Sequence, residues 1–207
     1  MRLLTRREIN ERQTHLRVTN LLFPNGFVIP MSAEMTITQW HVPVDDESNY
    51  WFALFTSFGS PVAKDEMRRQ RLELYQLPDY KPRLNRSNNW GYDPEEQRTK
   101  TFTGMGFDIN VHDQWACESL GPIADRTREH LGSSDKAIIA YRRLLRRSIE
   151  QVATGETPIM VLDRITAAAM TVPASMDAIA PTEGWQSYWC DIDGKRRNNA
   201  PWARTAA

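Results

Sequence analysis

Three runs of β-branched and aromatic residues follow one another between Leu16 and Phe58, and they constrain the fold more than any other feature. They read LRVTNLLF, MTITQWHVPV and YWFALFTSF, which is the composition of strands. An acidic turn, Asp45–Asn49, joins the second run to the third at a length typical of a hairpin loop. The sequence therefore predicts an antiparallel sheet and disfavours a parallel βαβ arrangement.

The middle run alternates with a period of two, so its side chains divide between two faces. One face would carry Thr36, Thr38, Trp40 and Val42, and the other Met35, Ile37, Gln39 and His41. Neither face is purely polar, and one of them is expected to line a pocket.

The rest of the chain predicts helices and loops. Residues 59–100 are charged and proline-punctuated, which indicates a surface excursion with short helices. A helix capped by Ser134 is expected, because apolar residues recur after it at helical spacing. Gly155 and Pro158 are expected to end it. After Thr171 an irregular tail is expected, whose three tryptophans dock on the body. The fold class is thus α+β, an antiparallel sheet followed by helices.

Composition limits which kinds of partner and which cellular compartment are expected for the chain. The chain has 207 residues, with 26 basic and 26 acidic side chains. This size suits one domain, and the balanced charge disfavours nucleic acid and acidic membranes as partners. Cys117 and Cys190 form no metal or disulfide pattern, and no apolar run is long enough to span a bilayer. We expect a cytoplasmic protein.

The segment DQWACESLGPIADRTREHLGSSD, from Asp113 to Asp135, carries a resemblance. It is similar to the catalytic domain of Rieske-type aromatic ring-hydroxylating oxygenase α subunits, in the branch of phthalate dioxygenase and dehydrodivanillate O-demethylase. In that branch the pattern D-x4-ESxGPIxDRTxEHLGxSD recurs. Weaker similarity extends back through NNWGYDPEEQRTKTFTGM and LRVTNLLFP.

The resemblance implies that residues 1–207 form a single, partial catalytic domain, the C-terminal portion of a helix-grip (START-like) fold. A Rieske [2Fe-2S] cluster needs C-x-H and C-x-x-H segments, and the sequence contains neither. The complete enzyme would hold that cluster, but this chain would not. His15 and His41 are isolated in the sequence and do not match the family's paired iron-binding histidines.

Asp113 is the residue that the resemblance makes a metal ligand. The family holds a mononuclear iron(II) with two histidines and one carboxylate, and a hard carboxylate oxygen suits that ion. The alternative is a helix-capping or ion-paired aspartate. His112 is left out because neighbouring side chains on a helix diverge by roughly 100°, and His130 because the family motif does not use it.

Gln114 and Trp115 are candidates for the border of the aromatic-substrate pocket, with a surface amide and core packing as the alternatives. Other charged residues of the motif are expected to form a buried salt-bridge network or a subunit contact. They are Glu118, Asp125, Arg126, Glu129 and His130.

The function implied is ring hydroxylation or O-demethylation of an aromatic acid. Its partners would be the aromatic substrate, O2, a reductase or ferredoxin electron donor, and further copies of the subunit. The chain is expected to be inactive without the Rieske and two-histidine segments. One explanation is a split oxygenase, in which a complementary polypeptide supplies them. Two alternatives stay open: a truncated remnant, and a non-catalytic module that binds aromatic ligands, since fold alone does not decide function.

Overall fold

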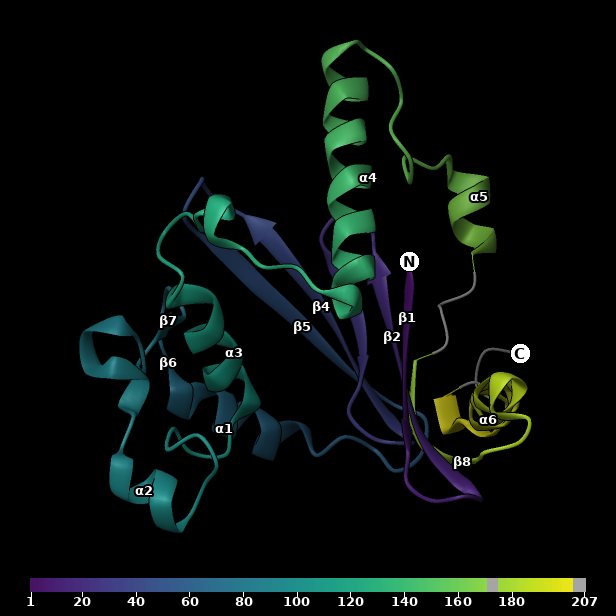
Figure 1. Ribbon diagram of the computed structural model, residues 1–207, viewed down its shortest axis with the longest axis horizontal. Coiled ribbons are helices and arrows are strands. Elements are labelled where there is room, and N and C mark those ends of the chain that lie inside the picture. Colours follow the sequence, from purple (N-terminus) through teal and green to yellow (C-terminus); the bar gives the residue numbers. More distant parts are fainter. Residues whose placement is uncertain (171–174, 203–207) are drawn as a thin grey trace. The chain divides into compact units, whose positions relative to one another are not determined.

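The computed structural model describes residues 1–170 and 175–202 of an α+β chain (Figure 1). The chain divides into two compact units. The first comprises Met1–Val44, Asn49–Val62 and His130–Ala207, and the second comprises Asp45–Ser48 and Ala63–Glu129. The predicted fold class is confirmed, whereas the single-domain organisation stays a prediction.

The first unit is built on a six-stranded antiparallel sheet. Its strands are β1 (Arg2–Glu8), β2 (Gln13–Leu22), β3 (Gly26–Pro30), β4 (Met35–Pro43), β5 (Asn49–Ser57) and β8 (Met176–Pro181). They follow the order β1-β2-β3-β4-β5, and β8 pairs with β2. The predicted hairpin is present, because β4 and β5 pair antiparallel from Met35 opposite Ser57 to Pro43 opposite Asn49.

Strand register fixes which side chains share a face, because residues directly opposite one another in an antiparallel pair point the same way. Asn20 lies opposite Val28, Val28 opposite Thr38, and Thr38 opposite Leu54. We call the face that carries these four residues the α6 face, since helix α6 (Trp185–Asn199) packs on part of it. The alternation predicted for β4 is therefore the observed one.

Under α6 the sheet is fully buried. Leu16, Val18 and Met176 are each 0% exposed, and Trp189 of α6 packs against them. Arg2 of β1 lies over the ring of Trp189, with 4.5 Å from its guanidinium carbon to the ring centroid. Figure 1 shows α6 beside β8 at this end of the sheet.

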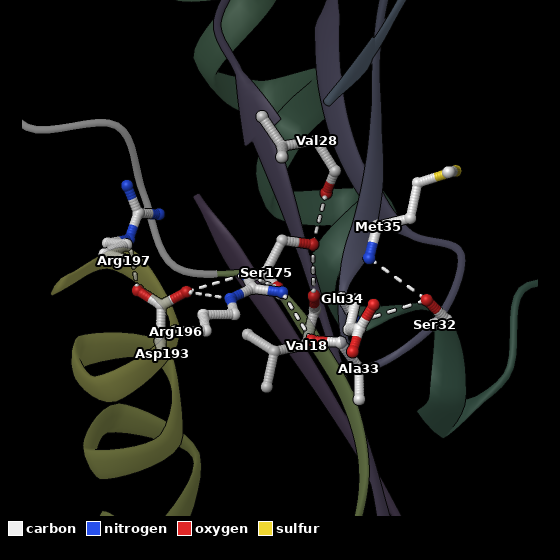
Figure 2. Close-up of polar contacts among 10 residues, drawn as sticks. All are labelled: Val18, Val28, Ser32, Ala33, Glu34, Met35, Ser175, Asp193, Arg196 and Arg197. Atoms are coloured by element: carbon white, nitrogen blue, oxygen red, sulfur yellow. Dashed lines mark hydrogen bonds and ion pairs between the residues drawn. The ribbon is translucent and has the colours of Figure 1, made fainter. Parts of the chain in front are cut away.

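A hydrogen bond from Arg196 ties α6 to the segment before β8 (Figure 2). Asp193 accepts hydrogen bonds from Arg196 Nε at 2.9 Å and from Arg197 Nε at 2.6 Å. Arg196 also donates to the backbone carbonyls of Ser175 and, at 3.1 Å, of Ala33. The side chains of Asp193 and Arg196 are both only 8% exposed. We call Asp193, Arg196 and Arg197 the Asp193 cluster.

Ser175 stands where β3 and β8 meet along β2. Its side-chain hydroxyl lies 2.9 Å from the carbonyl oxygen of Val18 and 3.2 Å from that of Val28. Ser175 is completely buried, so these contacts satisfy a polar group that would otherwise be costly to bury.

The end of the chain departs from the expected irregular tail. Residues 171–174 lie outside the described part of the chain, but from Ser175 onward it forms β8 and α6. The prediction missed them because β8 is recognisable only through its pairing with the distant β2. Docking of the tryptophans is confirmed: Trp185 and Trp189 pack on the sheet core, and Trp202 Nε1 donates to Ser57 O at 2.7 Å.

The predicted long helix is α4 (Lys136–Ala153), preceded by the 3-10 turn η3 (Ser133–Asp135). The expected cap by Ser134 is wrong, since α4 begins after Asp135 and no side chain caps it. The Asp135 carboxylate instead accepts from Gly132 N at 2.8 Å. The helix ends as predicted, with Gly155 at φ +78°.

The second unit contains short elements. They are α1 (Lys64–Leu74), β6 (Tyr75–Gln76), β7 (Lys81–Pro82), η1 (Arg86–Gly91), α2 (Pro94–Thr99), α3 (Ile109–Glu118) and η2 (Arg126–Arg128). Its core is formed by Trp90, Met105 and Val111, with Leu74 and Leu84 packed against them. The short helices predicted for residues 59–100 are present, but they belong to a compact unit with its own core and do not form a mere surface excursion. One further helix, α5 (Arg164–Ala169), belongs to the first unit.

None of the helices in residues 1–170 and 175–202 is both long and apolar enough to pass through a bilayer.

Replacing Asp193 with alanine should lower the free energy of unfolding by about 3 kcal/mol, because it leaves the buried Arg196 guanidinium without its carboxylate. Chemical denaturation followed by circular dichroism measures the difference. Asp191→Ala is the matched control, since Asp191 lies on the same helix but is exposed. Equal stability of the two variants would contradict a stabilising role for the Asp193 cluster.

Candidate functional site

Helix α3 positions the predicted metal ligand, and its start is well anchored. The side chain of Asp108 accepts a hydrogen bond from Asn110 N at 2.9 Å, which caps the helix. The same carboxylate forms an ion pair with Arg71 of α1. The beginning of α3 is thus joined to a second helix of its own unit.

His112 is held by the preceding loop. Its Nε2 lies 2.9 Å from the Thr103 hydroxyl and 3.0 Å from the carbonyl oxygen of Gly106. A carbonyl oxygen can only accept, so that contact needs the hydrogen on Nε2. This structural use of Nε2 agrees with leaving His112 out of the site.

Glu118, the last residue of α3, anchors the end of that helix through hydrogen bonds to its carboxylate. Its carboxylate accepts from Trp90 Nε1 at 2.7 Å and from Gln114 Nε2 at 2.9 Å. Gln114 also donates to the carbonyl oxygen of Leu84 at 3.1 Å. Trp90 is 6% exposed, at φ +52°. The structure thus brings Gln114 and Glu118 together around a buried indole, a partnership that sequence spacing did not reveal.

Asp113 lies on the exposed side of α3, away from these anchors. Ile109, one helical turn earlier, is 59% exposed, and Leu120, just past the helix, is 65% exposed. Trp115 is 43% exposed. The predicted iron ligand is therefore exposed on a helix that is anchored at both ends, and the exposed Ile109 lies one turn before it.

The remaining charges of the motif form local contacts. Asp125 accepts from Thr127 N at 3.0 Å and from its hydroxyl at 2.7 Å, and these bonds lower the pKa of Asp125. Arg126 pairs with Glu129 at 2.5 Å, but the Arg126 side chain is 64% exposed. Asp125 and Arg126 thus fix solvent-exposed turns and do not form the expected buried salt-bridge network, while the alternative of a subunit contact stays a prediction.

The other two histidines that the sequence left isolated have defined surroundings in the first unit. His15 Nε2 lies 2.7 Å from an Asp177 carboxylate oxygen, and Arg17 pairs with the other oxygen at 2.7 Å. His41 lies between the rings of Phe27 and Trp51, with centroids 5.4 Å and 4.9 Å away. The His15 pair was not predicted because Asp177 is 162 positions away.

No group of three or more His, Cys, Asp or Glu side chains in the described part of the chain is arranged to hold a metal ion. Asp113 is thus a single candidate ligand here, and the described residues do not by themselves fit an iron site.

Comparison of the sequence with known proteins identifies the family to which the chain belongs. The family model described as "LigXa C-terminal domain like" matches residues 2–200. The chain belongs to this family.

Two relatives agree with the LigXa C-terminal-like assignment. The phthalate 4,5-dioxygenase oxygenase subunit of Pseudomonas putida is 31% identical over 163 residues, which cover 74% of this chain and 36% of that subunit. The 3-chlorobenzoate-3,4-dioxygenase oxygenase subunit of Comamonas testosteroni is 28% identical over 167 residues, which cover 72% and 38%. The chain thus spans little more than a third of each relative. The resemblance to the C-terminal catalytic part of Rieske oxygenase α subunits is confirmed.

In this LigXa C-terminal-like chain the pKa of the Cys117 thiol depends on the charge of Asp113, one helical turn away. Partial burial raises the pKa of the Cys117 thiol, and the negative charges of Asp113 and Glu118 raise it further. Loss of the Asp113 charge should lower that pKa and so increase the thiolate fraction near pH 8.

Asp113→Asn should therefore speed the reaction of Cys117 with a disulfide reagent roughly two- to fivefold near pH 8. The measurement uses a Cys190→Ser background, since Cys190 is the other exposed free cysteine. The difference should vanish at a pH above the thiol pKa of both proteins. An unchanged rate near pH 8 would mean that the Asp113 charge does not act on Cys117.

Proposed function

We propose that this chain is the C-terminal catalytic part of a Rieske non-haem iron oxygenase α subunit, and that Asp113 supplies the carboxylate ligand to the catalytic iron(II). The observation that carries the proposal is the position of Asp113. It opens the motif shared with the family, and it lies on the exposed side of a helix anchored by Asp108 and Glu118.

The chemistry of that position suits a ligand. A carboxylate on a helix is placed by backbone geometry, and ligands on rigid elements keep the geometry that a metal needs. The described residues contain no group of three or more His, Cys, Asp or Glu side chains that could hold a metal ion. We therefore assign the two histidines of the iron site to the remainder of the subunit, the part of its relatives that lies outside the match.

Bound iron(II) would activate O2 for attack on an aromatic ring or a methoxy group. The chain's own contribution is to hold the carboxylate oxygen and to present apolar surface beside it. Trp115, partly exposed on α3, is proposed to contact the aromatic substrate. Gln114 instead has its amide engaged by Glu118 and Leu84, so its role toward substrate would be to fix the helix.

The relatives are named for phthalate and 3-chlorobenzoate, both aromatic carboxylates. We propose an aromatic acid as the substrate class, with ring hydroxylation or O-demethylation as the reaction. Electrons would come from a reductase or ferredoxin through the [2Fe-2S] cluster of the complete subunit, which would assemble with further copies. A cytoplasmic location fits this scheme.

The test is a chimera in which this chain replaces the matching segment of the P. putida subunit. Elemental analysis should find about one catalytic iron fewer per subunit in Asp113→Ala than in the parent chimera, with loss of turnover. The ligand is removed in that variant while the fold is kept, as circular dichroism would verify.

Asp125→Asn is the matched control, because asparagine keeps the side-chain oxygen that accepts from Thr127. It should retain iron. Full iron and activity in Asp113→Ala would refute the ligand assignment. A parent chimera that binds an aromatic acid but no catalytic iron would instead support the ligand-binding module.

A further inference from the structure

The α6 face of the sheet is covered at one end and open at the other. On the open end Val42 lies opposite Tyr50, Trp40 opposite Phe52, and Thr38 opposite Leu54. Val42 is 39% exposed, Tyr50 49%, Phe52 56% and Leu54 57%. We call Trp40, Val42, Tyr50, Phe52 and Leu54 the β4–β5 surface.

We propose that the β4–β5 surface is the docking site for the remainder of the oxygenase subunit, on the same or a separate polypeptide. The inference rests on the proposed function and names the partner that completes it.

The β4–β5 surface lies on the same face of the sheet as the hydrophobic core of the first unit. Leu16, Val18 and Met176 form that core, and α6 covers them completely. The polar Asn20 and Thr38 lie between the core and the β4–β5 surface. The β4–β5 surface is thus a separate apolar patch, and the largest apolar patch of a protein is often functional.

The outer edge of β5 is equally unprotected. Among the described strands β5 is paired only with β4, and its sequence NYWFALFTS contains no charge, proline or glycine. Native sheets usually guard an edge with charges, proline or bulges. Trp202 Nε1 donates to the carbonyl oxygen of Ser57, the last residue of β5. An added strand could pair along the rest of β5.

A second copy of this chain fits the surface less well. An aromatic side chain buries about 150–250 Å², so the β4–β5 surface exposes on the order of 400 Å². A standard interface needs roughly 800 Å² from each partner. Two copies paired through β5 would also set their apolar surfaces side by side on one face, where both stay open.

The remainder of the subunit fits better. The match with this chain covers 36% and 38% of the two relatives, so almost two thirds of each lies outside it. A body of that size can cover the apolar side chains and pair with the β5 edge together. Its contacting segment is expected to be apolar and uncharged, because the β4–β5 surface carries no charge.

The test co-expresses this chain, carrying an affinity tag, with the P. putida phthalate 4,5-dioxygenase oxygenase subunit from which the matching segment has been deleted. The wild-type chain should capture that polypeptide in near one-to-one amount. Phe52→Glu should reduce the captured amount at least roughly tenfold, because it places a charge in the centre of the interface.

Ala53→Glu is the matched control. Ala53 is exposed on the neighbouring position of β5 and points to the opposite face, so the same charge there should leave capture unchanged. Circular dichroism checks that both variants fold. No capture by the wild-type chain, or equal capture by the two variants, would overturn the proposal.

Two further measurements distinguish docking of the subunit remainder from self-association, and from failure of the ligand assignment. Sedimentation of the chain alone should show no dimer that Phe52→Glu dissociates, and such a dimer would assign the surface to a second copy. Asp113→Ala should be captured like the wild type. Iron retained in the Asp113→Ala chimera would therefore remove the ligand assignment, while capture would test docking independently.

Discussion

The first unit depends on one long-range contact: β8, near the C-terminal end of the chain, pairs with β2. The side of β2 that does not face β1 is shared by β3 and by β8, which comes from more than 150 positions later in the sequence. Ser175 lies at the junction and contacts a carbonyl of each neighbouring segment, Val18 and Val28. The Asp193 cluster then fixes α6 to that junction (Figure 2). Without this pairing the buried Leu16 and Val18 would lose their cover.

Local signals predicted the parts of the fold that are close in sequence. The β4–β5 hairpin has its turn residues between two β-rich runs, and α4 ends just before Gly155 and Pro158, which disfavour a helix. Both are short-range effects of backbone conformation. β8 and α6 could not be predicted in this way, because a short strand such as MDAIAP gains its stability from the distant β2. The cap at Ser134 failed because η3 extends the turn and shifts the N-cap of α4 by one residue, to Asp135.

The surroundings of the candidate site were predictable only in part, and the role of Asp113 stays a prediction. Helix geometry excluded His112, whose Nε2 contacts the loop before α3. The motif could not show that Glu118 accepts from both Gln114 and Trp90, since the contact with Trp90 joins residues 28 positions apart. Nor could the density of charge in the motif distinguish a buried network from exposed turns. Asp125 and Arg126 illustrate the difference, because a capping aspartate and a buried ion pair have the same sequence signature.

The exposed Asp113 and the uncovered β4–β5 surface impose a thermodynamic condition on the proposed oxygenase subunit. If two of the three iron ligands belong to the remainder of the subunit, iron(II) binds the joined form more tightly than either part. Linkage is reciprocal, so iron must then strengthen docking by the same factor by which docking strengthens iron binding. The β4–β5 surface would supply the iron-independent share of that affinity, since it is apolar and contains no ligand. Asp113 would supply the iron-dependent share, and the two contributions differ in their response to a chelator.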